Sequence, residues 1–124
     1  MKTISKFGKV LPKGHYSPAI IHNDTIYVSG QFSIDPQTGE QIFGSIEEET
    51  NQVLHNIELI LKEVGSDRNK VLKTTVYIPD IQLWIKVNDI YAVFFGGHKP
   101  ARTIIVTKEI HFGFQIEIDA IAAL

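Results

Sequence analysis

Arg102 is the residue of this sequence best placed to bind a small anion. The chain has only two arginines, and Arg68 lies in the polar segment Ser66–Asn69, where we expect a solvated charge. Arg102 instead begins an apolar run, where an unpaired guanidinium would be costly and where its planar fork would suit a carboxylate. Two alternatives stay open: a bound carboxylate, or an ion pair with Glu117 or Asp119, which from composition alone is the more frequent arrangement.

Glu117 is the second candidate, in the alternating segment 114–122 near the end of the chain. If the last two strands form a hairpin centred near residue 110, Arg102 lies opposite residues 117–119. A register slip of one residue would turn Glu117 to the other face of the sheet. A glutamate in such an alternation usually faces solvent, so the spacing alone leaves its role open.

The other residue types that carry chemistry form no recognisable motif. There is no cysteine, which excludes a disulfide, a thiolate nucleophile and a cysteine metal site. No Gly-x-Ser-x-Gly elbow supports a serine hydrolase. The five histidines lack paired ligand spacing, so we expect no metal site: His15, His22, His55, His98 and His111.

Length and charge narrow the classes of function. A chain of 124 residues predicts a single domain, residues 1–124, to which burial in an oligomer would add stability. The net charge of −2 and the absence of a basic run argue against nucleic acid as a partner. Without an apolar signal core or a stretch of about 20 apolar residues, we expect no membrane association and a cytoplasmic location.

The elements that must position these residues follow from local patterns. A capping box formed by Ser45 and Glu48 predicts a helix that runs to Gly65. The other predicted elements are a hairpin over 18–29 with its turn at Asn23-Asp24, a strand over 71–78, a helix over 81–95 after Asp80, and strands over 102–107 and 114–122. The order β-β-α-β-α-β-β predicts an α+β fold with two helices on one face of a mixed sheet.

Eight colinear segments carry a resemblance to a known family. They are Gly14-x-Tyr16-Ser17-x-Ala19, Ser29-Gly30-Gln31, Asp35-Pro36-x-Thr38-Gly39, Thr50-x-Gln52-Val53-x-x-Asn56-Ile57, Thr75-Val76-Tyr77, Val87-Asn88-x-x-Tyr91-x-x-Phe94-Phe95, Pro100-Ala101-Arg102 and Ile116-Glu117-Ile118-x-Ala120-Ile121-Ala122. Together they span residues 14–122 and resemble the Rid family, the reactive intermediate deaminases.

The resemblance implies a fold, an assembly and a site. Family members have a chorismate-mutase-like fold and form homotrimers with a barrel-like centre and clefts between subunits. By this resemblance Arg102 binds the substrate carboxylate and Glu117 positions the attacking water, while Tyr16, Gly30 and Asn88 line the cleft.

The chain also departs from the family pattern. His15 and Pro18 replace commoner residues around Tyr16, and the segment Ile110-His111-Phe112-Gly113 replaces the usual Leu-Pro loop. Ile104 stands where many members carry cysteine or a small residue, and we expect it to contact substrate. These changes put the substrate range in question.

The implied activity is hydrolysis of 2-imino and 2-enamino acids, such as 2-iminobutanoate and 2-iminopropanoate, to 2-keto acids and ammonia. A protonated imine is already electrophilic, so we expect no metal and no cofactor. Two alternatives remain: a trimer that binds small 2-keto acids without turnover, and the endoribonuclease or translation-inhibitor activity attributed to some members. The net charge and the two arginines disfavour RNA.

Overall fold

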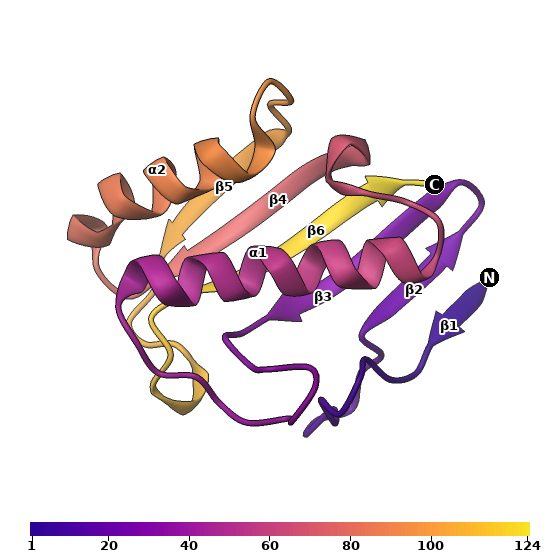
Figure 1. Ribbon diagram of the computed structural model, residues 1–124, viewed down its shortest axis with the longest axis horizontal. Coiled ribbons are helices and arrows are strands. Elements are labelled where there is room, and N and C mark those ends of the chain that lie inside the picture. Colours follow the sequence, from indigo (N-terminus) through magenta and orange to yellow (C-terminus); the bar gives the residue numbers. More distant parts are fainter.

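The computed structural model describes residues 1–124 and places two helices on one face of a six-stranded mixed sheet (Figure 1). The strands are β1 (Lys2–Ile4), β2 (Ala19–His22), β3 (Thr25–Gln31), β4 (Val71–Ile78), β5 (Ala101–Val106) and β6 (Glu117–Ala123). The helices are α1 (Ile46–Glu63) and α2 (Trp84–Phe95), with 3-10 turns at Arg68–Lys70, Ile81–Leu83 and His111–Gly113. The predicted α+β fold is confirmed, with β1 as an additional edge strand that the sequence analysis did not predict.

The longer helix forms where its sequence predicts it. The Ser45 hydroxyl accepts a hydrogen bond from the Glu48 amide, and the Glu48 side chain accepts one from the Ser45 amide. These bonds satisfy two amides that the first turn of a helix otherwise leaves unpaired. Gly65 follows the last turn with a φ of 85°, a backbone conformation that glycine adopts without strain.

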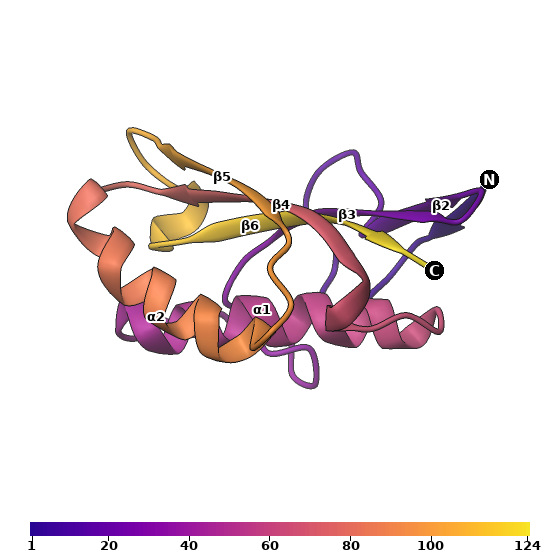
Figure 2. The ribbon, with the colours of Figure 1, turned by 90° about the horizontal axis from the view of Figure 1, so that it is seen from above.

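The hydrophobic core lies between the helices and one face of the sheet (Figure 2). Along β6 the apolar residues Ile118, Ala120 and Ala122 point into this layer, and the intervening residues point to the opposite face. No helix covers that second face, which we call the open face (Figure 2). Large side chains remain accessible on it: Tyr27 is 47% exposed and Ile105 is 41% exposed.

The sheet order corrects the predicted pairing of the last two strands. The order is β1-β2-β3-β6-β4-β5, so β4 separates β5 from β6. Strands β4 and β5 are parallel neighbours because α2 makes the crossover between them, and β6 inserts antiparallel between β3 and β4. Arg102 therefore pairs with Thr74, and Glu117 pairs with Tyr77. The two candidate residues do not face each other across a hairpin.

Two predicted boundaries also shift. Asp80 caps the 3-10 turn Ile81–Leu83 through a bond from the Gln82 amide, and the α-helix begins only at Trp84. The last strand begins at Glu117 rather than at Phe114. The backbone before it is held instead by the Glu49 carboxylate, which accepts the Gln115 amide at 2.9 Å. No helix of the structure combines the length and apolar character that a membrane span requires.

Candidate active site

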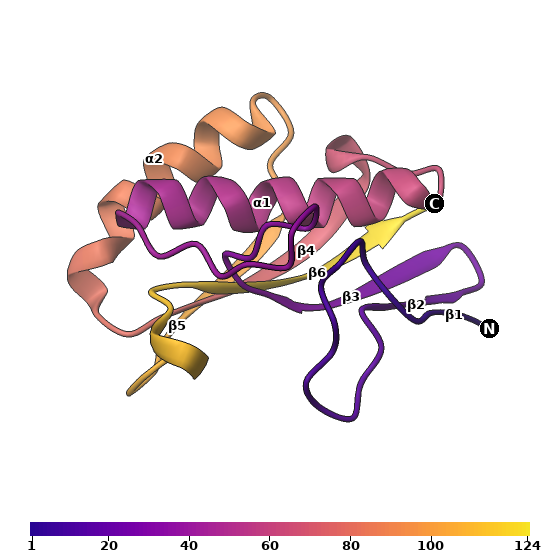
Figure 3. The same cartoon turned by 60° about the horizontal axis from the view of Figure 1, so that its bottom comes forward.

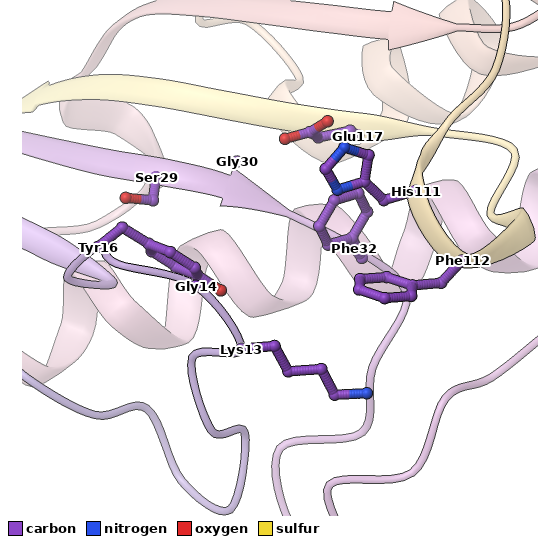
Figure 4. A pocket seen from close by; sticks show the side chains of 9 residues that line it. All are labelled: Lys13, Gly14, Tyr16, Ser29, Gly30, Phe32, His111, Phe112 and Glu117. Atoms are coloured by element: carbon purple, nitrogen blue, oxygen red, sulfur yellow. The ribbon is translucent and has the colours of Figure 1, made fainter.

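The Glu117 side chain borders a cavity of about 440 Å³ on the open face of the sheet (Figure 4). The loop before β2 and the loop between β5 and β6 extend from this face of the sheet (Figure 3), and both contribute residues to the lining of the cavity. Its lining residues are Lys13, Gly14, Tyr16, Ser29, Gly30, Phe32, His111, Phe112 and Glu117. The cavity therefore combines one carboxylate with aromatic walls and two basic side chains.

The loop before β2 brings Tyr16 to this cavity. The Ser29 hydroxyl donates to the Ser17 carbonyl at 2.6 Å, and the Ser29 amide donates to the Pro18 carbonyl at 2.9 Å. These bonds fasten the loop to β3. Gly30 follows on the same strand, and a side chain there would collide with the Glu117 carboxylate. The absence of a Cβ at Gly30 is what leaves room for Glu117.

Buried contacts fix the start of β6. The Glu49 carboxylate is almost fully buried and accepts both the Gln115 amide and its side-chain amide, each at 2.9 Å. The Phe114 ring stacks between Phe32 and Phe43, with ring centroids 5.3 and 5.0 Å away. Glu117 lies two residues after Gln115 and three after Phe114, so these contacts fix its position.

The Glu117 carboxylate is partly withdrawn from water and accepts no hydrogen bond within the chain. Its burial raises its pKa, the nearby His111 opposes this rise, and Asp119 adds to it. A carboxyl group with a raised pKa that borders a cavity is suited to accept and return a proton near neutral pH.

Arg102 borders a different cavity, between α2 and β5. Its Nη1 donates to the Asn88 side-chain oxygen at 3.0 Å. Its guanidinium carbon lies 5.0 Å from the centre of the Trp84 ring and 4.7 Å from that of Tyr91. The Tyr91 hydroxyl shares a hydrogen bond of 2.7 Å with the Thr74 hydroxyl. Arg102 thus has an amide and two aromatic faces as partners, but no carboxylate.

The predicted residues divide into two groups within one chain. Tyr16 and Gly30 join Glu117, and Asn88 joins Arg102. The two cavities share no lining residue, and they lie on opposite faces of the sheet. Glu117 alternates with core residues of β6 and so faces the open side, whereas Arg102 contacts α2.

Neither ion pair considered for Arg102 forms. Asp119 accepts a hydrogen bond from the Tyr77 hydroxyl at 3.1 Å, and Glu117 is out of reach. Ile104, two residues after Arg102 on the same face of β5, packs against the core and lines neither cavity. Its contact with substrate stays a prediction.

The expectation for Arg68 is wrong. Its guanidinium pairs with Glu58 through Nε and Nη2, donates to the Phe94 carbonyl at 2.8 Å, and lies 4.0 Å from the centre of the Phe94 ring. Sequence alone missed this pair because Glu58 lies ten residues earlier, on α1. The polar residues around Arg68 predicted a solvent-exposed side chain, whereas Arg68 packs against residues of α1 and α2.

Sequence reasoning also missed most of the Glu117 cavity wall. Lys13, Phe32 and Phe112 fit no catalytic pattern, and His111 was considered only as a metal ligand. The one available signal was that residues 110–113 depart from the loop usual in the resembling family. Across the structure, no three histidine, aspartate or glutamate side chains converge in a way that could hold a metal ion.

Comparison with known proteins agrees with this architecture. The family model described as Endoribonuclease L-PSP matches residues 8–124. A rat protein named 2-iminobutanoate/2-iminopropanoate deaminase is 44% identical over 109 residues, which are 88% of this chain and 80% of the rat protein. A Yersinia pestis structure described as a member of the conserved Rid protein family matches with a TM-score of 0.92 at 38% identity, covering 99% of this chain and 98% of that one. The chain belongs to the Rid family.

Not all Rid relatives carry a specific activity in their names. A RutC family protein of Pyrococcus abyssi is 43% identical over 111 residues, covering 90% of this chain and 87% of that protein. Membership therefore supports a Rid-type protein of this fold.

Proposed function

We propose that this Rid protein hydrolyses 2-imino acids, and their enamine tautomers, to 2-keto acids and ammonia. The observation that carries the proposal is the state of Arg102: a guanidinium that borders a cavity and has no carboxylate partner in its own chain. Such a group is suited to bind the carboxylate of a small acid. The deaminase names of the mammalian relatives support the choice of reaction.

We further propose that the site is completed between subunits of a homotrimer. Arg102 and Glu117 lie in separate cavities on opposite faces of one sheet, so a substrate can contact both only if two copies contribute. The open face, with its exposed Tyr27 and Ile105, offers the apolar surface that such an assembly would bury.

In this site Arg102 of one subunit binds the substrate carboxylate and fixes the imine carbon near Glu117 of a neighbour. Water then adds to the carbon of the protonated imine: a C–O bond forms, the electron pair of the C=N bond moves to the positively charged nitrogen, and Glu117 takes a proton from the water. Glu117 returns this proton to the nitrogen of the carbinolamine. The C–N bond breaks as ammonia leaves with the electron pair, and the hydroxyl group loses its proton to give the 2-keto acid.

The test is the decay of an enamine generated in situ from threonine by a threonine dehydratase. The wild-type protein should speed the decay above the spontaneous rate. Arg102→Ala and Glu117→Gln should each lose most of this acceleration. If wild-type protein binds 2-ketobutyrate but leaves the decay unchanged, the protein binds without turnover and the proposal is wrong.

Mixing the two variants tests whether the site is shared. In trimers assembled from equal amounts of Arg102→Ala and Glu117→Gln chains, about one cleft in four combines an intact Arg102 with an intact Glu117. Co-refolded mixtures should therefore regain about a quarter of wild-type activity. As a control, Arg102→Ala chains refolded without the second variant should regain no activity. Lack of recovery in mixed trimers would place both residues in one subunit's site, against the geometry proposed.

A further inference from the structure

The loop between β5 and β6 places an imidazole beside Glu117. Within this loop Phe112 has a φ of 59° and Gly113 a φ of 79°, so the backbone turns sharply after His111. The His111 ring stacks on Phe32, with centroids 6.1 Å apart and planes 16° from parallel, and it meets the Phe112 ring edge-on at 5.8 Å. Two rings thus hold the imidazole in the cavity wall, next to the Glu117 carboxylate (Figure 4).

His111 is the basic group nearest to Glu117 among those around the cavity. The titratable side chains that face Glu117 come from four places: His111 from the β5–β6 loop, Asp119 from β6, Tyr77 from β4, and Lys13 and Tyr16 from the loop before β2. Lys13 lies across the cavity, with its ammonium 5.0 Å from the centre of the Phe112 ring (Figure 4).

The charges near Glu117 act in opposite directions. Burial and the carboxylate of Asp119 raise the pKa of Glu117, and His111 is the group that lowers it. A positive charge beside Glu117 favours the carboxylate form of that side chain over the protonated form. Removing His111 would therefore remove the contribution that opposes the effect of burial on the pKa of Glu117.

We propose that His111 is a positioning residue of the imine hydrolysis, whose imidazolium keeps Glu117 in the carboxylate form that accepts a proton from water. This inference depends on the proposed function for its catalytic meaning, but the electrostatic link between the two residues can be measured without any activity.

The direct test follows the side-chain carboxyl carbon of Glu117 by NMR during a pH titration of the intact protein, with Glu117→Gln to assign the signal. In His111→Gln the titration midpoint of Glu117 should rise by about one pH unit, because the nearby positive charge is lost. His55→Gln, which changes an exposed histidine on α1, should leave the midpoint in place. An unchanged midpoint in His111→Gln would overturn the inference.

The enamine-decay assay tests the catalytic consequence. The acidic limb of the pH dependence of kcat/KM should move upward with the midpoint, so that His111→Gln is slower than wild type by up to about tenfold at pH values below both midpoints and equal to wild type above both. Loss of activity at every pH with an unmoved limb would mark a structural role and overturn the inference. If no variant and no wild-type protein speeds the decay, the proposed function fails, and the NMR midpoint alone shows whether the two groups are coupled.

A second variant separates the effect of the charge at position 111 from the effect of a disturbed fold. His111→Lys keeps a positive charge while losing the aromatic stacking on Phe32. It should keep the midpoint of Glu117 near the wild-type value and restore the acidic limb. If His111→Lys behaves like His111→Gln, the charge of His111 is not what acts on Glu117, and the inference is wrong.

Discussion

The two arginines of this chain have the same chemistry and opposite surroundings. Arg68 uses three of its five N–H donors on Glu58 and the Phe94 carbonyl, whereas Arg102 uses one, on the neutral oxygen of Asn88. Both guanidinium groups also stack on aromatic rings. The difference is the carboxylate: Arg68 has one within its own chain, and Arg102 has none.

This difference separates a group that stabilises the fold from one that is available to a ligand. A carboxylate paired with a guanidinium in a partly buried place contributes to folding, and removing either partner leaves an uncompensated charge. A guanidinium oriented by rings and an amide keeps donors free for a bound carboxylate. We therefore expect changes at Arg68 to affect stability and changes at Arg102 to affect activity.

The largest expected effect is on catalysis. Arg102→Ala should lower kcat/KM in the enamine-decay assay by about 100-fold or more, because the charged hydrogen bonds that fix the substrate disappear. Its free energy of unfolding should stay within about 1 kcal/mol of wild type, since no ion pair is broken. Arg68→Ala, the matched control, should keep kcat/KM within about threefold while folded. A fully active Arg102→Ala protein would remove the distinction between the two arginines.

The next effect is on stability. Glu58→Gln should lower the free energy of unfolding by about 2 kcal/mol, because it weakens the charged bonds to Arg68 and leaves that cation partly buried without a counter-charge. Urea denaturation at a fixed protein concentration measures this loss. Glu63→Gln, at the exposed end of the same helix, should change it by less than about 0.5 kcal/mol. Equal effects of the two changes would mean that the Glu58–Arg68 pair contributes nothing specific.

A smaller catalytic effect is expected when the side chain at position 102 keeps its positive charge but is no longer a planar guanidinium. Arg102→Lys should lower kcat/KM by about tenfold, because an ammonium group attracts a carboxylate without the two parallel bonds of a guanidinium. Steady-state kinetics with a single enamine measures the change. Activity equal to wild type would show that charge alone anchors the substrate.

The smallest effect is a pH dependence of stability. Hydrogen bonds from Arg68 hold the pKa of Glu58 below its ordinary value of 4.5, against the opposing effect of burial. Because the folded-state pKa is the lower one, the ionised Glu58 stabilises the fold above about pH 4.5 and loses this contribution as the pH falls through the folded-state value. The gap in unfolding free energy between wild type and Glu58→Gln should therefore be widest near neutral pH and narrow in acid. A gap that stays constant down to about pH 3 would contradict the pairing.

Local signals predicted the elements well where the chain interacts with itself at short range. The capping box at Ser45 defines the start of α1, and the strand predicted over 71–78 matches β4. These local signals failed where the backbone conformation depends on a residue far away in the sequence. In the segment before Glu117, apolar and polar residues alternate as in a strand. The Gln115 amide nevertheless donates its hydrogen bond to the Glu49 carboxylate of α1 instead of to a neighbouring strand.

The candidate site shows the same division. Residue type and spacing selected Arg102 and Glu117 as candidates, and the resemblance to the family added Tyr16, Gly30 and Asn88. The type of each side chain already limits the chemistry it can perform. Only the tertiary structure decided that Arg102 and Glu117 lie on opposite faces of the sheet, that Glu58 belongs to Arg68, and that His111 stands beside Glu117. Alternation along a strand tells which residues share a face, but the order of strands in a sheet depends on contacts between segments far apart in the chain, and these leave no local pattern.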